Sequence, residues 1–328
     1  MRIFSGAAAF YVANNTEYVD ALKAAVISGR REAPSLVPVV VFTGPKSAEQ
    51  TALERWLQRH GSVGITHNLS FQHDMDMLSL DPEWSFSQFL LGSWLRVDLP
   101  NVLKSIAKLE SLASMSSRFR KDLKLVNQEY VLWTDVDILF RGSIGSCTLA
   151  KPQVLSVGPD KRMGWPENYG VIYFNVSGYR EIFPRLIGWG REQRFHFDHD
   201  QNLFLAYWGT AVDVLPNGMN WKPYWGDAST AIPGPVTHEQ TRIVHFHGPK
   251  LSTAICFFNR LDRTGNSDKI SVSVDRIREC GLREAPNGDM EWLRLLASLL
   301  TQAYERDKGQ FYRELSQQVD MYLASTVS

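Results

Sequence analysis

Short apolar runs alternate with amphipathic stretches along most of the chain, a pattern typical of folds that layer helices on a sheet. Val37–Thr43 is an apolar run of strand length, and Ser47 three residues before Gln50 predicts the capped start of a helix. Two more helices are predicted, from residue 15 or 16 to about 29 and over 97–124. Further strands are predicted at 7–13, 130–133, 153–157, 170–175, 211–215 and 242–246. The pattern predicts an α/β fold.

The last part of the chain has a different pattern. Apolar residues recur at helical spacing from Trp292 to Leu300 and again from Phe311 to Tyr322. We therefore predict a main α/β domain over 1–260 and a mostly helical extension over 261–328. The extension is expected to pack on the main domain, with a protein or membrane-surface contact as the alternative.

The charge of the chain excludes one class of partner. Its 328 residues include 35 Lys and Arg and 35 Asp and Glu, so no broad basic field is available to bind nucleic acid. No apolar run approaches the ~18 residues of a membrane span, and no signal-peptide core is visible. The three cysteines lack the spacing of zinc or redox motifs. We expect a cytoplasmic protein without a transmembrane segment.

Two carboxylates follow directly after the apolar run Tyr130–Trp133. Asp135 and Asp137 are separated by one residue, and ligands of α/β sheets bind beyond the carboxyl ends of the strands. Two neighbouring aspartates repel each other unless a cation lies between them. Oxygen ligands of this kind suit Mg²⁺ or Mn²⁺, which also bind phosphate oxygens. The segment therefore predicts a divalent metal site, although Asp-x-Asp alone is common and one Asp could simply cap a turn.

A second candidate lies in the segment Ile243–Lys250, where an apolar run ends in histidine. His245 could supply a nitrogen ligand to the same ion, which favours Mn²⁺ over Mg²⁺. Gly248 lets backbone approach a phosphate closely, and Lys250 is a point charge for it.

These motifs, taken with others in the same order, resemble those of the GT-A-fold glycosyltransferases. Within them the chain is similar to glycosyltransferase family 8, the glycogenin and galactosyltransferase-like group. The segments that carry the resemblance are 13–18, 94–100, 130–140, 168–175, 200–202 and 245–250. The resemblance implies a Rossmann-like mixed sheet flanked by helices and the transfer of a sugar from a nucleotide sugar, a UDP-sugar by preference. The chain departs from the family pattern in three segments. Asn15 replaces the usual Asp, and Trp133-Thr134 stand in place of the common Tyr/Leu. In the segment 245–250 the spacing is shorter and no Pro-Trp pair follows Lys250.

The resemblance also implies a role for particular residues. Asp135, Asp137 and His245 correspond to the metal ligands, and Asp135 also belongs to the donor site. Arg96 and Lys250 correspond to partners of the donor diphosphate.

Nucleotide and sugar contacts come from other segments. Ala13 and Asn15 correspond to nucleotide contacts, whereas Asn168, Asp200 and Gln201 correspond to the sugar-binding and reacting centre. The implied reaction transfers a hexose or pentose (galactose, glucose or xylose) to a hydroxyl of a glycan or glycoconjugate with retention at the anomeric carbon. Retention could follow from attack on the same face of the sugar, with Asp200 as a covalent nucleophile the alternative.

Two other functions stay open at this point. A metal-dependent phosphatase also has Asp-x-Asp after a strand, but that motif is expected near the N-terminus, and a nucleotide-sugar hydrolase uses similar chemistry. A nucleotide-sugar-binding protein without catalysis is the third reading. It is disfavoured because Asp135, Asp137 and His245 are all present.

Overall fold

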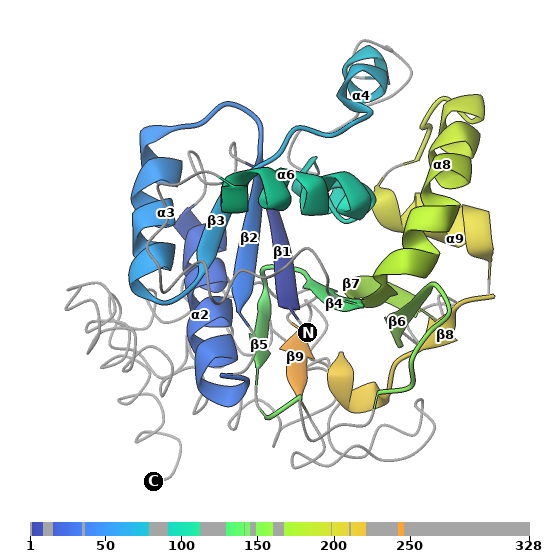
Figure 1. The fold of residues 1–328 in the computed structure, drawn as a ribbon. Coiled ribbons are helices and arrows are strands. Elements are labelled where there is room, and N and C mark those ends of the chain that lie inside the picture. The colour runs from blue at the N-terminus through green and yellow to red at the C-terminus, as the bar shows by residue number, and fades with distance from the viewer. Residues whose placement is uncertain are drawn as a thin grey trace, which may run out of the picture. The chain divides into compact units, whose positions relative to one another are not determined.

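The computed structural model describes residues 2–8, 16–34, 37–78, 91–111, 129–140, 142–144, 149–159, 167–197, 199–209, 211–220 and 242–245 (Figure 1). The chain divides into two compact units. The first comprises residues 1–19, 34–136 and 145–216, and the second comprises 20–33, 137–144 and 217–328. The predicted boundary at 260/261 and the predicted C-terminal helices lie outside the described residues.

The first unit is built on a mixed seven-stranded sheet of order β3-β2-β1-β4-β7-β6-β8. Its strands are β1 (Arg2–Ala8), β2 (Pro38–Thr43), β3 (Val63–Thr66), β4 (Tyr130–Thr134), β6 (Leu155–Pro159), β7 (Glu167–Asn175) and β8 (Asp213–Val214). Strands β3, β2, β1 and β4 are parallel, β7 runs antiparallel to both β4 and β6, and β8 is parallel to β6. The parallel half brings the carboxyl ends of β1, β2 and β4 to one edge, where ligands bind in such sheets.

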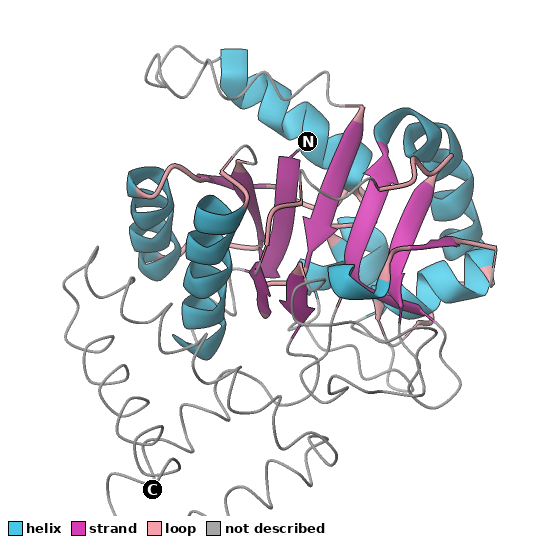
Figure 2. Ribbon diagram, turned by 90° about the horizontal axis from the view of Figure 1, so that it is seen from below, coloured by secondary structure: helices cyan, strands magenta, loops and turns pink. Residues whose placement is uncertain are grey.

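Helices surround this sheet in the first unit (Figure 2). They are α3 (Ala48–Arg59), α4 (Gln72–Leu78), α5 (Leu91–Trp94), α6 (Leu99–Ser111), α8 (Val176–Glu192) and α9 (Asp200–Trp208). One apolar cluster joins side chains of β2, β3, β4, β6 and β7 to side chains of α4, α5, α6, α8 and α9. Burial of this apolar surface is the main favourable term that holds the layers together.

Helix α3 begins where the sequence predicts. The Ser47 side chain accepts a hydrogen bond of 3.1 Å from the Gln50 backbone N–H, which satisfies a donor that the first turn otherwise leaves unpaired. Leu53, Trp56 and Leu57 are the apolar residues that this helix buries. The structure therefore confirms the helix that the Ser47 cap and the apolar spacing predict.

The second unit pairs two short strands, β5 (Ile138–Phe140) and β9 (Ile243–His245), antiparallel with Ile138 opposite His245. It also holds the 3-10 helix η2 (Asn217–Met219) and, from residue 20 onward, helix α2 (Thr16–Glu32). The Ser28 hydroxyl of α2 accepts a hydrogen bond of 3.0 Å from the Phe140 N–H, which links this helix to β5. The strand pair thus fixes the chain just after Asp137.

Several predicted boundaries were wrong. Strand β1 begins at Arg2 and not at residue 7, because it pairs on both sides, with β2 and with β4, although Arg2 and Ser5 make its start look polar in the sequence. Residues 9–15 lie outside the described part of the chain. Helix α2 continues past Gly29 to Glu32, since the Gly29 carbonyl still accepts from the Ala33 N–H. Pairing of Glu167 with Pro159 extends β7 to residue 167, ahead of the predicted start at 170.

No helix among the described residues is long and apolar enough to cross a membrane.

Gly178, in the first turn of α8, allows close packing against the chain before β6. A Cβ atom added there would lie 1.9 Å from the backbone oxygen of Gln153. We expect Gly178→Ala to lower the free energy of unfolding by about 1–3 kcal/mol, the usual range for overpacking. Gly188→Ala in the same helix is the control, because nothing lies within 4 Å of its added Cβ. Urea denaturation of both variants checks this, and equal stabilities would contradict it.

Candidate functional site

Arg96, between α5 and α6, forms ion pairs with two aspartates of the first unit. Its Nε lies 2.8 Å from Oδ2 of Asp200, and its Nη2 lies 2.7 Å from Oδ1 of Asp135. The Nη1 group donates to the backbone carbonyl of Tyr169, and Nε also donates to the Ser93 carbonyl at 3.0 Å. Arg96 thus connects the end of β4 to the starts of α9 and β7.

Two of the three charged side chains in this arrangement are almost fully buried. The side chains of Arg96 and Asp200 are 5% and 3% exposed, whereas that of Asp135 is 29% exposed. Asp135 is the more accessible of the two carboxylates, so a cation that approaches this cluster from solvent would meet it first.

Asn168 and Gln201 lie beside this cluster in the same unit. The Asn168 Oδ1 accepts a hydrogen bond of 3.0 Å from the Gly170 N–H, and the Gln201 Oε1 accepts one of 3.4 Å from the Tyr169 N–H. The Asp135 N–H donates to the Gly170 carbonyl at 2.7 Å. Strand β7 therefore joins Asn168, Gln201 and Asp135, which the sequence assigned to the donor and sugar sites.

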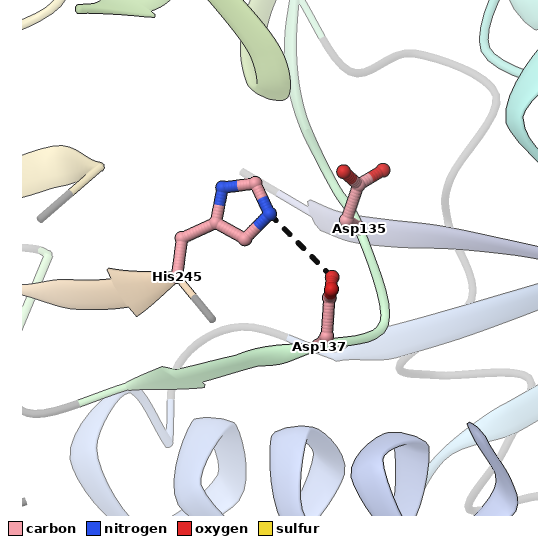
Figure 3. A group of neighbouring side chains, drawn as sticks. All are labelled: Asp135, Asp137 and His245. Carbon is pink, nitrogen blue, oxygen red and sulfur yellow. Dashed lines mark ion pairs between the residues drawn. The ribbon is translucent and has the colours of Figure 1, made fainter. Parts of the chain in front are cut away.

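In the second unit, Asp137 and His245 form a buried pair (Figure 3). The His245 Nε2 lies 3.5 Å from Oδ1 of Asp137, and their side chains are 1% and 8% exposed. The His245 Nδ1 lies 2.9 Å from Oδ1 of Asn220. Pairing of β5 with β9 explains this proximity, because Asp137 directly precedes Ile138, the residue opposite His245.

Asp135 precedes Asp137 by two residues along the chain. With His245 they supply two carboxylates and one imidazole, a group that could hold a metal ion. This set of carboxylate oxygens and one imidazole nitrogen suits a divalent metal ion, and it differs from a structural zinc site of the cysteine type.

The remaining predicted donor contacts cannot be placed. Ala13, Asn15, Gly248 and Lys250 lie outside the described residues.

Glu167, at the start of β7, is a residue that the sequence analysis missed. It is 3% exposed, and its Oε2 makes no hydrogen bond with any described residue. Burial raises the pKa of its carboxyl group above the ordinary value. The register of β6 against β7 shifts between Val157 and Gly158, beside Glu167, and such bulges are frequent next to active sites. Its position directly before Asn168 was the available sequence signal.

We expect Glu167→Gln to stabilise the protein at alkaline but not at acidic pH. The carboxyl pKa is higher in the folded than in the unfolded chain, so the folded state loses stability as pH rises through the folded pKa. Glutamine stays neutral and avoids this loss. Melting temperatures at about pH 4 and about pH 8 check it. Glu181→Gln, at an exposed position of α8, is the control, and an equal shift for Glu167→Gln at both pH values would contradict the expectation.

Comparisons with known proteins identify the fold. The galactosyltransferase LgtC, in a complex with donor and acceptor sugar analogs, shares 18% identity and superposes with a TM-score of 0.50, covering 76% of this chain and 88% of that one. An active-site mutant of LgtC shares 15% identity with a TM-score of 0.52, covering 84% of this chain and 96% of that one. No family model and no curated protein matches the sequence.

The chain therefore has the GT-A glycosyltransferase fold. The mixed sheet flanked by helices agrees with the fold that the sequence motifs implied. At these identities the likeness establishes the fold alone, and the activity has to be argued from the site.

Proposed function

We propose that this protein is a metal-dependent retaining glycosyltransferase that moves a sugar from a UDP-sugar to a hydroxyl of a glycan or glycoconjugate. The observation that carries the proposal is the buried Asp137–His245 pair directly after strand β4 of a GT-A fold. Asp135, two residues earlier, adds the second carboxylate. Asp135, Asp137 and His245 would hold Mn²⁺, with Mg²⁺ as the alternative.

The charge of the departing nucleoside diphosphate explains why a bound metal ion is needed for this reaction. Negative charge grows on its bridging oxygen as the glycosidic bond breaks, and a bound metal ion supplies a Lewis acid for that charge. Lys250 and Arg96 are proposed as further cationic partners of the diphosphate, and Gly248 as a close backbone contact. Ala13 and Asn15 are proposed to contact the nucleotide.

The Arg96 cluster supports a sugar-binding role for Asp200. We assign Asn168, Asp200 and Gln201 to the sugar and the reacting centre, since β7 and the start of α9 bring them together. The Asp200 carboxylate is ion-paired with Arg96 and almost fully buried. An ion-paired carboxylate is a poor nucleophile, so this contact favours attack by the acceptor hydroxyl on the same face that the diphosphate leaves.

A thermal-shift panel of UDP-, GDP- and CMP-sugars, with and without Mn²⁺, tests the proposal. A ligand that binds only the folded state at about 100 times its Kd adds roughly 2.7 kcal/mol of stability. We expect UDP-sugars to raise the melting temperature only when Mn²⁺ is present. UDP-galactose, UDP-glucose and UDP-xylose are compared within the panel to find the donor sugar.

Product analysis with glycan acceptors then follows the sugar to a new glycosidic bond and reads its anomeric configuration. Lack of stabilisation by every nucleotide sugar would refute the proposal. Hydrolysis of a phosphomonoester with no sugar transfer would replace it with the phosphatase reading, which the GT-A fold does not favour.

A further inference from the structure

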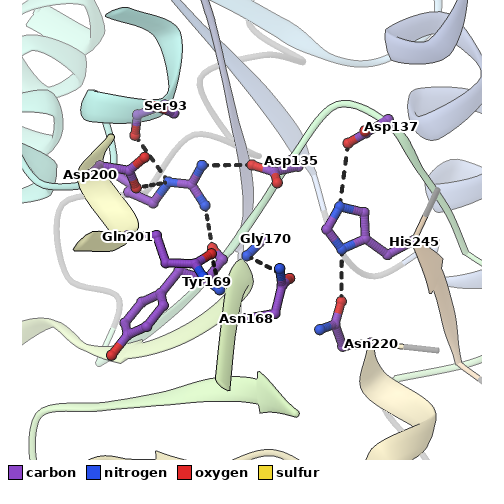
Figure 4. Close-up of polar contacts among 11 residues, drawn as sticks. Ser93, Asp135, Asp137, Asn168, Tyr169, Gly170, Asp200, Gln201, Asn220 and His245 are labelled. Carbon is purple, nitrogen blue, oxygen red and sulfur yellow. Dashed lines mark hydrogen bonds and ion pairs between the residues drawn. The ribbon is translucent and has the colours of Figure 1, made fainter. Parts of the chain in front are cut away.

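His245 has a fully buried amide partner that no sequence motif indicated. Asn220 and His245 are each 0% exposed as whole residues, and the Asn220 Oδ1 lies 2.9 Å from the His245 Nδ1 (Figure 4). Both residues belong to the second unit. A buried polar contact of this length is a hydrogen bond, and substitution of either residue removes that bond.

The backbone around Asn220 is tied to the strand that carries His245. The Asn220 N–H donates to the Asn217 carbonyl at 3.3 Å, which closes the turn of η2. The Arg242 N–H donates to the Gly218 carbonyl at 2.7 Å, which attaches η2 to the start of β9. These two bonds hold the main chain of residues 217–220 next to the start of β9, the strand that carries His245.

The chemistry of the two groups sets the tautomer of the imidazole. A carbonyl oxygen only accepts hydrogen bonds, so the His245 Nδ1 must carry the proton. A neutral imidazole protonated at Nδ1 has its lone pair on Nε2. That nitrogen faces Asp137, and its 3.5 Å distance to the carboxylate oxygen is longer than an ordinary hydrogen bond.

We propose that Asn220 is a positioning residue, which fixes His245 in the Nδ1–H tautomer and orients its Nε2 lone pair to bind a divalent cation beside Asp137. The proposal deepens the proposed function, because the cation is the one assigned to Asp135, Asp137 and His245. Histidine ligands of metals almost always donate their second N–H to such a partner, and loss of that partner commonly weakens metal binding by about 10–100-fold.

Two substitutions separate the hydrogen bond from side-chain volume. Asn220→Leu keeps the size and removes the acceptor, whereas Asn220→Asp keeps an acceptor oxygen. Mn²⁺ titration of the full chain, followed by the electron-spin signal of the free ion, gives the dissociation constants. We expect a Kd about 10–100-fold higher for Asn220→Leu and a Kd close to wild type for Asn220→Asp. Asn68→Leu, at an exposed position, is the control and should leave the Kd unchanged.

A second measurement uses the wild-type protein without metal, so it does not depend on the folding of any variant. Nitrogen-15 NMR of the metal-free wild-type protein reports which nitrogen of His245 carries the proton. The proposal requires Nδ1–H, and an Nε2–H tautomer would overturn it even if Asn220→Leu failed to fold.

The two failures are distinguishable. If the wild-type chain binds no Mn²⁺, the proposed metal site falls, and the NMR result alone decides the role of Asn220. If the wild-type chain binds Mn²⁺ and Asn220→Leu binds it equally well, the metal site stands and the positioning role is refuted.

Discussion

Asp137→Ala is expected to abolish the Mn²⁺-dependent stabilisation by UDP-sugar and to lower kcat by about 10³-fold. Asp137 is a buried carboxylate 3.5 Å from the His245 Nε2, so its loss removes a proposed metal ligand beside the imidazole. Bound metal ions contribute several kcal/mol to transition-state stabilisation, and each 1.36 kcal/mol corresponds to about tenfold in rate. Steady-state kinetics over a range of Mn²⁺ concentrations, beside thermal shifts, provides the measurement.

Asp213→Ala is the matched control for this experiment. Asp213 is an exposed aspartate of β8, and its replacement should leave both the melting temperature and kcat unchanged. Full Mn²⁺-dependent activity of Asp137→Ala would rule out Asp137 as a ligand. Loss of activity in both variants would point to a general effect on the fold.

Arg96→Leu is expected to lower the free energy of unfolding by about 3–5 kcal/mol, the range for removal of one partner from a buried ion pair. The guanidinium contacts Asp135, Asp200 and the Tyr169 carbonyl at once. Without it, Asp200 stays almost fully buried and loses its cationic partner. Urea denaturation followed by circular dichroism gives the free energy, and Arg96→Leu combined with Asp200→Asn should recover part of the loss.

The exposed ion pair between Arg191 and Asp74 offers a matched comparison. Its Nε–Oδ2 distance is 3.2 Å, but the two side chains are 55% and 28% exposed. Such pairs contribute roughly 0–1 kcal/mol, so Arg191→Ala should change stability little. If Arg96→Leu and Arg191→Ala lower the free energy of unfolding equally, the buried ion pairs of Arg96 contribute no more to stability than an exposed pair does.

The position of Arg96 links two parts of the proposed reaction. It contacts Asp135, proposed to bind the metal, and Asp200, proposed to bind the donor sugar. Movement of one carboxylate would shift the Arg96 guanidinium and thereby change its contact with the other carboxylate. The direct contact of Arg96 with the donor diphosphate stays a prediction.

The local pattern of the sequence was sufficient for most elements of the fold. A continuous apolar run such as 130–133 has few alternatives to a buried strand, and Ser47 with Gln50 marks a helix start by chemistry that is complete within four residues. The order of the motifs then indicated the GT-A fold, which the comparisons confirm. Asp135 and Asp137 followed as metal-ligand candidates because both their chemistry and their place after a strand are visible locally.

Only the tertiary structure decided which distant groups meet. Arg96 and Asp200 are more than a hundred residues apart in the sequence, and their contact depends on where α9 begins beside β7. The burial of Glu167 and the Asn220–His245 bond depend in the same way on strand pairing and on η2. Glutamate and asparagine are ordinary surface residues. Glu167 and Asn220 are buried here by packing between segments far apart in the sequence. The periodicity of apolar residues along the chain does not predict such burial.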